Sequence, residues 1–455
     1  MRPSEAIARV QNAYLADSRP WVIGFSGGKD STATLQLVWS ALERLPAGSA
    51  KKPVYILSSN TLVESPLIVR YIGGTLKSIN EQAVDRGLPI SASLVEPIVE
   101  ESFWVNVIGR GYPAPSTKFR WCTDRLKISP ANRFIKDQVA RFGEVVLVLG
   151  VRKAESATRA QVMALHEIDG SEFRTHSTLS GALVFAPIEN WSTDDVWGYL
   201  LQNPRTQWGS DNNDLAAMYR TADGECPLVV DTTTPSCGSS RFGCWVCTVV
   251  TRDKSMQAMV DAGLAPWMEQ LLEIRDFLAD TQVASRKRET RSIRKLDGRI
   301  LLKDSGDEAA FGPYRLEFCK ELLERLLRIQ TSLPPEAGDI SLISDEELVT
   351  IRKFWREQRN DWEDSVPKIY ERVTAKRWFS LTDTSSSSED DAEVIRGACE
   401  KHGVPSLLLR RLLDAERRAS GMRRRVGIYD RLSSILDEDW RSDEQVAHDI
   451  AVLGS

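Results

Sequence analysis

A glycine-rich hexapeptide near the N-terminus has the residue types that bind phosphate groups. Residues 26–31 (Ser-Gly-Gly-Lys-Asp-Ser) follow the apolar run 21–25 and precede the helical pattern of residues 31–45. Two adjacent glycines let the backbone approach an anion, and a helix N-terminus adds partial positive charge. The lysine supplies a cation, while Ser31 and Thr32 supply hydroxyl donors. The spacing is not that of a Walker A loop. We therefore expect a polyphosphate site built from a strand, this loop and a helix.

Four cysteines lie close together near the middle of the chain. Cys226, Cys237, Cys244 and Cys247 are spaced C-x10-C-x6-C-x2-C, with glycines and prolines among them. Four thiolates suit either Zn²⁺ or a [4Fe–4S] cluster. The segment lacks the paired Cys-x-x-Cys knuckles typical of zinc sites, and its neighbours between 242 and 246 are largely apolar. We expect a [4Fe–4S] cluster, with zinc and free thiols as the alternatives.

Another cysteine, Cys122, lies in the basic stretch 118–127 (Lys-Phe-Arg-Trp-Cys-Thr-Asp-Arg-Leu-Lys). The cations of this stretch are expected to lower the pKa of the thiol and to hold phosphates. Three roles are open for Cys122: a carrier of sulfur as a persulfide, a cluster ligand in place of Cys226, or a buried structural cysteine. We interpret Cys319 and Cys399, which fall on helical patterns, as packing residues.

Apolar runs that alternate with helical periodicity indicate how these motifs are positioned. Such alternation predicts an α/β fold with a mostly parallel sheet covered by helices on both faces. Ligands of such sheets bind beyond the carboxyl ends of the strands, where the motifs above fall. Helical patterns dominate after residue 255. The runs expected to form strands are 21–25, 53–58, 90–95, 144–150 and 183–188.

The chain is therefore expected to contain three regions. Residues 1–205 form the nucleotide domain, residues 206–255 the cysteine-rich segment, and residues 256–455 a mostly helical region that binds DNA or partner proteins. Residues 381–393, rich in serine and acidic residues, read as a flexible linker.

Charge and hydropathy limit the possible partners. The net charge of −5 argues against a general nucleic-acid binder, yet basic residues concentrate in 286–303 and 410–425. Each basic run is either a solvated helix face or a contact for a phosphate backbone. No run of about 18 apolar residues suggests a membrane span. With no recognisable leader at its start, the chain is expected to be cytoplasmic.

The hexapeptide resembles the pyrophosphate loop of the N-type ATP pyrophosphatases, which include PAPS reductases, ATP sulfurylase subunits and tRNA thiolation enzymes. Residues 150–156 (Gly-Val-Arg-Lys-Ala-Glu-Ser) with Arg159 resemble the Gly-x-Arg…Glu-Ser…Arg motif of PAPS reductase relatives. Two arginines would there hold phosphate or sulfonate oxygens; a helix start with surface arginines is the alternative. Residues 186–197 match the segment that follows the family's sheet, where Ser192 or Thr193 would cap a helix and Trp197 would pack it.

The resemblance implies an adenine nucleotide alpha hydrolase-like fold and cleavage of ATP to AMP and pyrophosphate with Mg²⁺. It departs from the family pattern at Asn60, where an aspartate is usual. The catalytic residues it implies are Lys29, Asp30, Ser31 and Cys122. The nucleotide-binding residues it implies are Ser26, Gly27, Gly28, Lys29, Asp30, Ser31, Thr32, Asn60, Lys127, Gly150, Arg152 and Arg159.

Within this superfamily, residues 21–250 are most similar to the DndC family, the PAPS-reductase-like proteins of bacterial DNA phosphorothioation. That resemblance implies a cysteine desulfurase as sulfur donor, a [4Fe–4S] cluster, and a complex with other Dnd proteins on DNA. The product would be DNA in which sulfur replaces a non-bridging phosphate oxygen. The alternatives are a PAPS reductase, a tRNA-thiolating sulfurtransferase, and, because of Asn60, a non-catalytic assembly subunit.

Overall fold

The computed structural model describes most of the 455-residue chain. The described residues are 2–221, 243–295, 300, 310–338, 340–359, 361–379, 389–419, 427–438, 440–441 and 445–446. They divide between two compact units. The sheet unit comprises residues 1–101 and 115–275, and the helical unit comprises residues 102–114 and 276–455.

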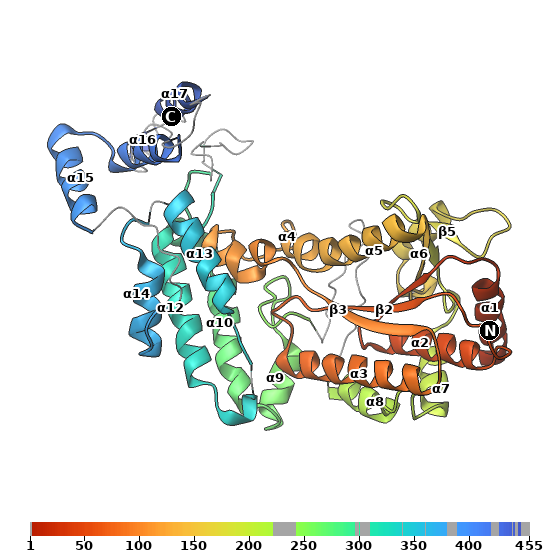
Figure 1. Ribbon diagram of the computed structural model, residues 1–455. Coiled ribbons are helices and arrows are strands. Elements are labelled where there is room, and N and C mark those ends of the chain that lie inside the picture. The colour runs from red at the N-terminus through yellow and green to blue at the C-terminus, as the bar shows by residue number, and fades with distance from the viewer. Residues whose placement is uncertain are drawn as a thin grey trace. The chain divides into compact units, whose positions relative to one another are not determined.

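The sheet unit is built on six strands in the order β3-β2-β1-β4-β6-β5 (Figure 1). All neighbouring strands are parallel except the short β5, which pairs antiparallel with β6. The long parallel strands are strongly apolar because helices cover both faces of the sheet. The predicted α/β fold class is therefore confirmed. The strands are β1 Trp21–Gly24, β2 Val54–Ser59, β3 Ile90–Val95, β4 Val145–Val148, β5 Arg174–Thr175 and β6 Ala182–Phe185.

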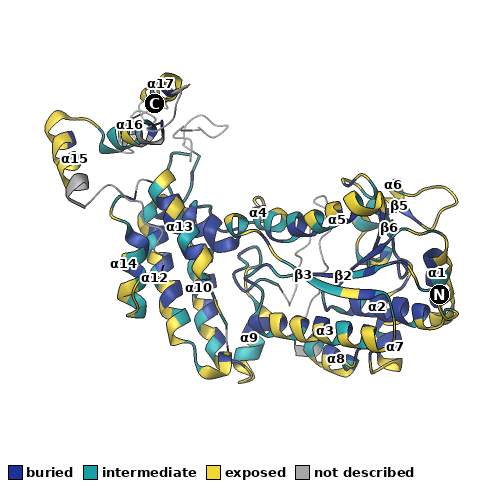
Figure 2. Cartoon of the chain, in the orientation of Figure 1, coloured by how far each residue is buried: buried dark blue, intermediate teal, exposed yellow. Residues whose placement is uncertain are grey.

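Alternate side chains along each strand face two different layers of helices. Ile23, Ile56 and Val148 face the larger core, which α1, α2, α3, α7 and α8 complete. Leu57 and Leu147 face a smaller core closed by α5. The central strands β1 and β4 are buried along almost their whole length, whereas the edge strand β3 is partly exposed and is drawn partly in teal and yellow in Figure 2. The bounds of these helices are α1 Pro3–Leu15, α2 Lys29–Glu43, α3 Pro66–Asp85, α5 Ser129–Phe142, α7 Thr193–Gln202 and α8 Asn212–Thr221.

Shorter elements complete this unit. A single helical turn, α4 Trp121–Thr123, leads through a π-helix at Asp124–Ile128 directly into α5. The others are α6 Ala157–Leu165, α9 Lys254–Asp261 and the 3-10 turns Val99–Glu101, Lys153–Glu155 and Pro266–Met268. The chain leaves the sheet unit within α10 Glu269–Asp280.

The helical unit has no strand among its described residues. A π-helix at Val105–Gly109 belongs to its core, although this segment lies far earlier in the sequence. The Trp104 indole donates to the carbonyl of Leu342 (2.7 Å), and the Trp355 indole donates to that of Ile108 (2.7 Å). Its remaining helices are α11 Ala284–Thr290, α12 Leu316–Ser332, the 3-10 turn Pro335–Ala337, α13 Asp345–Gln358, α14 Ser365–Thr374, α15 Glu389–His402, α16 Ser406–Ala419 and α17 Ile428–Leu436.

The observed domain boundaries differ from those predicted from the composition of the sequence. Residues 256–275 belong to the sheet unit, and residues 102–114 belong to the helical unit. Residues 389–393, which composition assigns to a linker, begin α15, because a Glu-Asp-Asp sequence is favourable at a helix start. The rest of that predicted linker lies outside the described residues. Within the described part of the chain, no helix has the length and apolarity required to cross a bilayer.

Candidate functional site

The phosphate loop joins β1 to α2, as the sequence predicts. Gly28 precedes the first helical residue, Lys29, and Gly27 adopts a left-handed conformation (φ +72°) that favours glycine. The Ser31 hydroxyl donates to the carbonyl of Gly28 (2.9 Å), and the Ser26 N–H donates to the Ser31 hydroxyl (3.3 Å). These bonds close the loop against the first turn of the helix.

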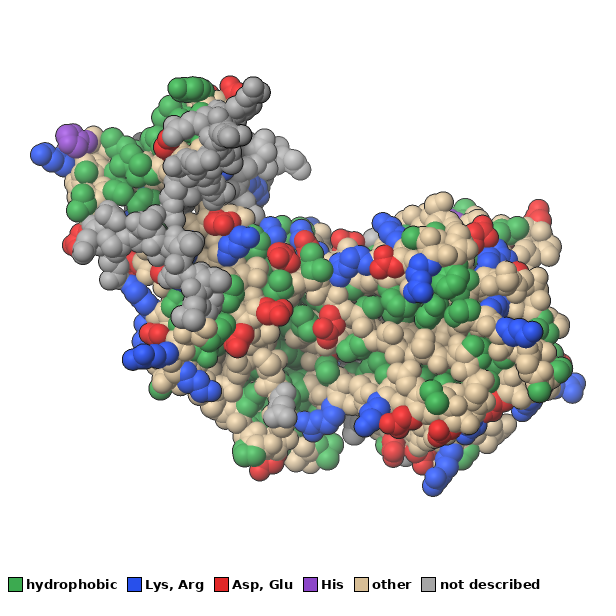
Figure 3. All heavy atoms as spheres, viewed as in Figure 1, with side chains coloured by type: hydrophobic (Ala, Val, Ile, Leu, Met, Phe, Trp, Pro, Cys, Tyr) green, Lys and Arg blue, Asp and Glu red, His purple; other side chains and the backbone are tan. Residues whose placement is uncertain are grey.

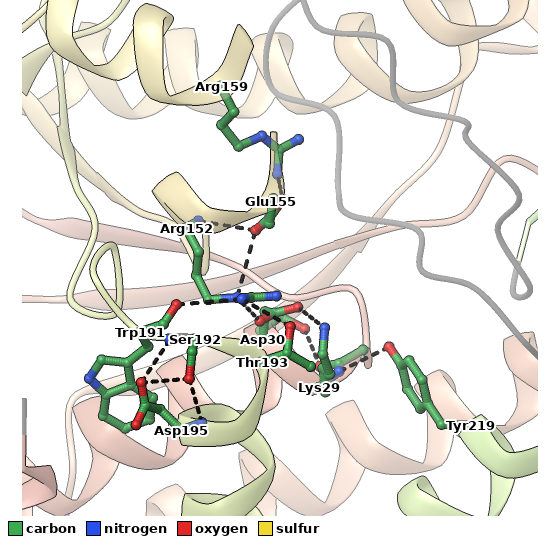
Figure 4. Close-up of polar contacts among 12 residues, drawn as sticks. Lys29, Asp30, Arg152, Glu155, Arg159, Trp191, Ser192, Thr193, Asp195 and Tyr219 are labelled. Atoms are coloured by element: carbon green, nitrogen blue, oxygen red, sulfur yellow. Dashed lines mark hydrogen bonds and ion pairs between the residues drawn. The ribbon is translucent and has the colours of Figure 1, made fainter. Parts of the chain in front are cut away.

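Asp30 lies between two cations at the start of α2 (Figure 4). Its carboxylate accepts from the fully buried Lys29 ammonium (2.8 Å) and from Arg152 Nε (2.5 Å). Arg152 is also almost fully buried, and its guanidinium lies 3.4 Å from both the carbonyl of Trp191 and the hydroxyl of Thr193. The charges of Lys29 and Arg152 therefore compensate the carboxylate of Asp30 and hold β1, β4 and α7 together at this edge of the sheet.

The loop after β4 packs directly on the phosphate loop. A Cβ atom on Gly150 would lie only 2.7 Å from the carbonyl oxygen of Asp30 and 3.0 Å from the Ser31 nitrogen, so only glycine fits. Two residues later the Arg152 N–H donates to Glu155 (3.0 Å), and Glu155 also pairs with Arg159. The arginines of the Gly-x-Arg…Glu-Ser…Arg motif thus bind carboxylates of the chain itself.

The segment that follows the sheet has the structural role predicted for it. Ser192 caps α7 by accepting from the Asp195 N–H (3.1 Å), and the Asp195 carboxylate accepts from the Ser192 N–H (2.7 Å). The same carboxylate also lies 2.8 Å from the Ser192 hydroxyl, and the two bonds that it accepts from Ser192 hold the pKa of Asp195 below its ordinary value. Trp197 packs edge-on against Tyr219 of α8, with ring centroids 5.2 Å apart.

A hollow of about 840 Å³, its solvent-filled mouth included, opens beside the loop. Its polar lining comes from residues 26–28 and the end of β2, and its apolar lining comes mainly from α3 and α8. This mixed lining suits a nucleotide with a hydrophobic base and an anionic tail. Of the predicted site residues, Ser26, Gly27, Gly28, Asn60 and Lys127 line the hollow. The others, Lys29, Asp30, Ser31, Thr32, Gly150, Arg152 and Arg159, are not among its lining residues.

Sequence reasoning missed the contribution of α8 to this site. Leu215, Met218 and Tyr219 belong to the apolar lining of the hollow. The Tyr219 hydroxyl accepts from the backbone N–H of Lys29 (3.2 Å), pointing from α8 toward the loop (Figure 4). The i, i+3, i+4 spacing of these apolar residues is the available signal, but it does not reveal which element they face.

Asn60 has a structural role at the end of β2. Its side-chain oxygen accepts from the Leu62 N–H (3.0 Å), and its amide donates to Glu96 beyond the end of β3 (2.8 Å). Leu62 adopts a left-handed backbone conformation (φ +64°), which is rare for a branched residue. The Asn60 side chain thus stabilises the turn at residues 60–64, a function that needs its oxygen but no net charge.

The same turn binds the cysteine segment. Glu64 and Cys244 form an antiparallel bridge, and the Trp245 N–H donates to the carbonyl of Val63 (2.9 Å). The Cys244 sulfur lies 3.3 Å from the Thr61 hydroxyl and 3.8 Å from a Glu64 carboxylate oxygen. That Glu64 oxygen also lies 3.3 Å from the ammonium of Lys127. A wall of the hollow, formed in part by Asn60, Glu64 and Lys127, therefore contacts a predicted cluster ligand.

The expectation of an acidic Cys122 thiol is wrong. Burial and the nearby Cys247 together raise the pKa of Cys122 to about 11, and the charge of Lys127 opposes this rise without cancelling it. Two cations of this stretch are paired with carboxylates, Lys127 with Glu64 and Arg125 with Glu101. Burial also raises the pKa of Cys244 well above its ordinary value, and the charge of Glu64 adds to that rise.

The thiols among the described residues are suitable ligands for a soft metal ion, but they are not arranged as a ready metal site. Cys122 interacts electrostatically with both Cys244 and Cys247, so these three thiols lie close to one another. No three His, Cys, Asp or Glu side chains form a ready metal site among the described residues. Cys226 and Cys237, the other two predicted ligands, lie outside the described residues. Cys319 and Cys399 are buried packing residues, as predicted.

Some residues of both basic runs form hydrogen bonds or ion pairs within the helical unit. Arg291 and Lys295 donate to the carbonyl of Phe311 (both 3.0 Å). In the second run Arg411 pairs with Glu438, and residues 420–426 lie outside the described part of the chain. On the face drawn in Figure 3, basic and acidic side chains are interspersed over the surface.

Comparison with known proteins identifies the family of the sheet unit. Residues 20–249, half of the chain, match the family model of the phosphoadenosine phosphosulfate reductase domain. The chain belongs to this family. The PAPS reductase-like family comprises nucleotide-binding enzymes of sulfur chemistry.

The individual proteins that this chain resembles have low sequence identity to it. An uncharacterized protein of Methanocaldococcus jannaschii is 28% identical over 197 residues, which are 43% of this chain and 34% of that protein. The chain thus spans about a third of the length of this curated relative. The PAPS reductase of Candida auris, solved as a phosphate complex, is 15% identical, with a TM-score of 0.30 over 48% of this chain and 85% of that one. The U34-tRNA thiolase NcsA of Methanococcus maripaludis, solved with its [4Fe-4S] cluster, is 10% identical, with a TM-score of 0.28 over 62% of this chain and 83% of that one.

Proposed function

We propose that this chain binds ATP in the hollow beside residues 26–31, cleaves it between the α and β phosphates, and uses the adenylyl group to activate a phosphate for sulfur transfer. The observation that carries this proposal is the turn at residues 60–64. Asn60 and Glu64 of this turn line the hollow, while Thr61, Val63 and Glu64 contact the Cys244–Trp245 segment. A nucleotide in the hollow would therefore adjoin the thiols.

The polar lining of the hollow suits the triphosphate. The backbone of residues 26–28 and the N-terminus of α2 present N–H groups and partial positive charge, and Lys127 adds a cation to the lining. Glu64 lines the hollow, where one of its oxygens pairs with Lys127 (3.3 Å), and it offers the oxygen ligand that Mg²⁺ prefers. Asp30 does not line the hollow and is held between Lys29 and Arg152. We propose that Glu64 faces the metal and that Asp30 fixes the shape of the loop.

The thiols suit an iron–sulfur cluster because they are soft ligands in poorly hydrated surroundings. Cys244 and Cys247 would hold it together with Cys226 and Cys237, or with Cys122 in place of Cys226. Such a cluster supplies an iron site at which sulfur can be delivered. The turn at residues 60–64 would hold Cys244 beside the hollow, which keeps the sulfur donor near the activated phosphate.

We propose DNA as the acceptor, on the resemblance of residues 21–250 to the DndC family. A non-bridging phosphodiester oxygen is a poor leaving group. If it attacks the α-phosphorus of ATP, pyrophosphate leaves and the oxygen becomes part of AMP, a good leaving group. A sulfide-level sulfur nucleophile can then attack the phosphorus, and AMP leaves with the former non-bridging oxygen to give the phosphorothioate. A cysteine desulfurase would supply the sulfur as a persulfide, and a two-electron reductant such as a pair of thiols would reduce it to the level of sulfide. The helical unit would bind DNA or the other Dnd proteins.

Pyrophosphate release tests the first half of this proposal. The full chain, purified anaerobically, is mixed with ATP and Mg²⁺, with and without DNA and the partner proteins. Lys29→Ala and Ser31→Ala are expected to abolish release, while Lys77→Ala, an exposed lysine on α3, should leave it unchanged. Release that survives both loop substitutions would show that the loop is not the catalytic site. No release under any condition would favour a non-catalytic assembly subunit.

Mass spectrometry of nucleic acids tests the second half. DNA from cells with the gene is expected to yield phosphorothioate dinucleotides on digestion, and DNA from cells without it should not. A Cys247→Ser gene should also yield none. Thiolated nucleosides in tRNA alone would indicate a tRNA sulfurtransferase, and sulfite release from a sulfonucleotide would indicate a reductase. Either result without modified DNA would refute DNA as the acceptor.

A further inference from the structure

The Tyr219 hydroxyl accepts a hydrogen bond from a backbone N–H group at the end of the phosphate loop. It accepts from the N–H of Lys29 (3.2 Å), the first residue of α2. A Cβ atom on Gly28 would lie 3.0 Å from the same oxygen, so the hydroxyl lies against the backbone of two successive loop residues. The first N–H groups of a helix have no partner within the helix and must be satisfied from outside. Tyr219 satisfies one of them from a helix that is 190 residues away in sequence.

The ring of Tyr219 is held in this position by packing. It meets Trp197 of α7 edge-on, with centroids 5.2 Å apart and planes at 81°. One helical turn earlier, Leu215 is buried in the main core and fixes α8 against the sheet unit. Tyr219 also lines the hollow. The hydroxyl therefore lies against the phosphate loop within the lining of the proposed nucleotide site.

A phosphate oxygen and a tyrosine hydroxyl are rival acceptors for this N–H. Helix N-termini bind phosphates through these donors, and a charged acceptor forms a shorter and stronger bond than a neutral one. We infer that the Tyr219 hydroxyl holds the place of a phosphate oxygen at Lys29 and is displaced when a polyphosphate binds. This inference rests on the proposed function insofar as it takes a polyphosphate as the ligand of the loop.

Displacement gives Tyr219 a measurable effect on affinity. A polyphosphate must break the bond between the hydroxyl and Lys29 before it can use that N–H, so the bond weakens binding. Removing the hydroxyl should strengthen binding of a polyphosphate about three- to ten-fold, the range expected for one neutral hydrogen bond. A residue with a purely structural role would not strengthen binding when its polar atom is removed.

Tyr219→Phe tests the inference in the full chain purified anaerobically, with inorganic pyrophosphate as the probe and calorimetry as the readout. The matched control is Tyr55→Phe, because Tyr55 of β2 does not line the hollow and its ring packs on Phe134. We expect Tyr219→Phe to bind pyrophosphate three- to ten-fold more tightly than the wild type, and Tyr55→Phe to bind it equally. Adenosine, which lacks phosphate, should bind all three proteins alike.

Two results would overturn the inference while leaving ATP binding intact. Equal affinity of the wild type and Tyr219→Phe would mean that the bond has no effect, and weaker binding by the variant would mean that the hydroxyl contacts the bound phosphate. If neither protein binds ATP or pyrophosphate, the proposed function fails as well. Should the variant fold poorly, fluorotyrosine-labelled wild type replaces it: pyrophosphate must shift the ¹⁹F signal of Tyr219 more than that of Tyr55, and an unmoved Tyr219 signal refutes displacement.

Discussion

Gly150→Ala probes the contact between the β4 loop and the phosphate loop. The backbone of Gly150 is not in the left-handed region, so alanine can adopt its conformation and only the added methyl group matters. That methyl group would lie 2.7 Å from the carbonyl oxygen and 2.8 Å from the carbonyl carbon of Asp30. These are backbone atoms of the first turn of α2. Unlike a flexible side chain, they cannot move away by changing rotamer. The loop and the helix must therefore move apart by about half an ångström.

The size of the effect follows from this displacement. Overpacking of this kind costs about 1–3 kcal/mol, which lowers the Tm of a unit of this size by about 3–9 °C. Catalytic rates fall about 100-fold for a misplacement of 1 Å, so half that distance should lower the rate of pyrophosphate release about ten-fold. The affinity for ATP should change less than the rate, because the residues that line the hollow remain in place.

Gly74→Ala is the matched control for this prediction. Gly74 lies on α3 with no heavy atom within 4 Å of an added Cβ, and alanine there should leave stability unchanged or raise it by up to about 1 kcal/mol. Thermal unfolding monitored by circular dichroism and a coupled pyrophosphate assay measure both effects. If Gly150→Ala melts and turns over like the wild type, the close packing of Gly150 on Asp30 is refuted.

Three further substitutions probe other contacts of the sheet unit. Ser192→Ala removes the cap of α7 and should lower the free energy of unfolding by about 1 kcal/mol in chemical denaturation. Burial opposes the charged form of Glu189, but Arg174 and neighbouring cations outweigh it and lower its pKa. Glu189→Gln should therefore cost about 3 kcal/mol at pH 7. That difference should shrink as the pH falls below the ordinary glutamate pKa of about 4.3, because the carboxylate of the unfolded chain then binds a proton before that of the folded chain. The loss is complete once the pH is below the lowered pKa of the folded protein; a pH-independent difference would contradict this account. Cys247→Ser should lose iron measured on anaerobically purified protein, whereas the buried Cys319→Ser should retain it.

The sequence predicts the architecture well where local pattern determines it. The apolar runs at 21–25, 53–58 and 144–150 form central strands because both faces of a parallel sheet are covered. The loop at 26–31 opens a helix because its glycines and hydroxyl residues favour that turn. The two-residue strand β5 is missed because a pairing this short leaves no periodic signal.

Long-range contacts account for what the sequence does not predict. Residues 102–114 are as apolar as a strand of the sheet unit, yet they join the helical unit through bonds to residues more than 230 positions away. Arginine is a residue type that commonly binds phosphate, so the sequence suggests that role for Arg152. Its actual position next to Asp30 depends on how β4 packs against α2, which the sequence does not reveal. Tyr219 is missed because its partner is the backbone of Lys29, which no pattern in α8 reveals.

The turn at residues 60–64 explains why an asparagine is compatible with the proposed chemistry. A left-handed Leu62 costs about 1 kcal/mol or more, and the turn holds it through the Asn60 oxygen on one side and the bond between Val63 and Trp245 on the other. An aspartate could accept the same bond, but its charge would lie beside Glu96, where the Asn60 amide now donates. The side chain at position 60 is therefore suited to shaping the wall between the nucleotide and the thiols. The carboxylate that faces the hollow is supplied by Glu64, within the same turn.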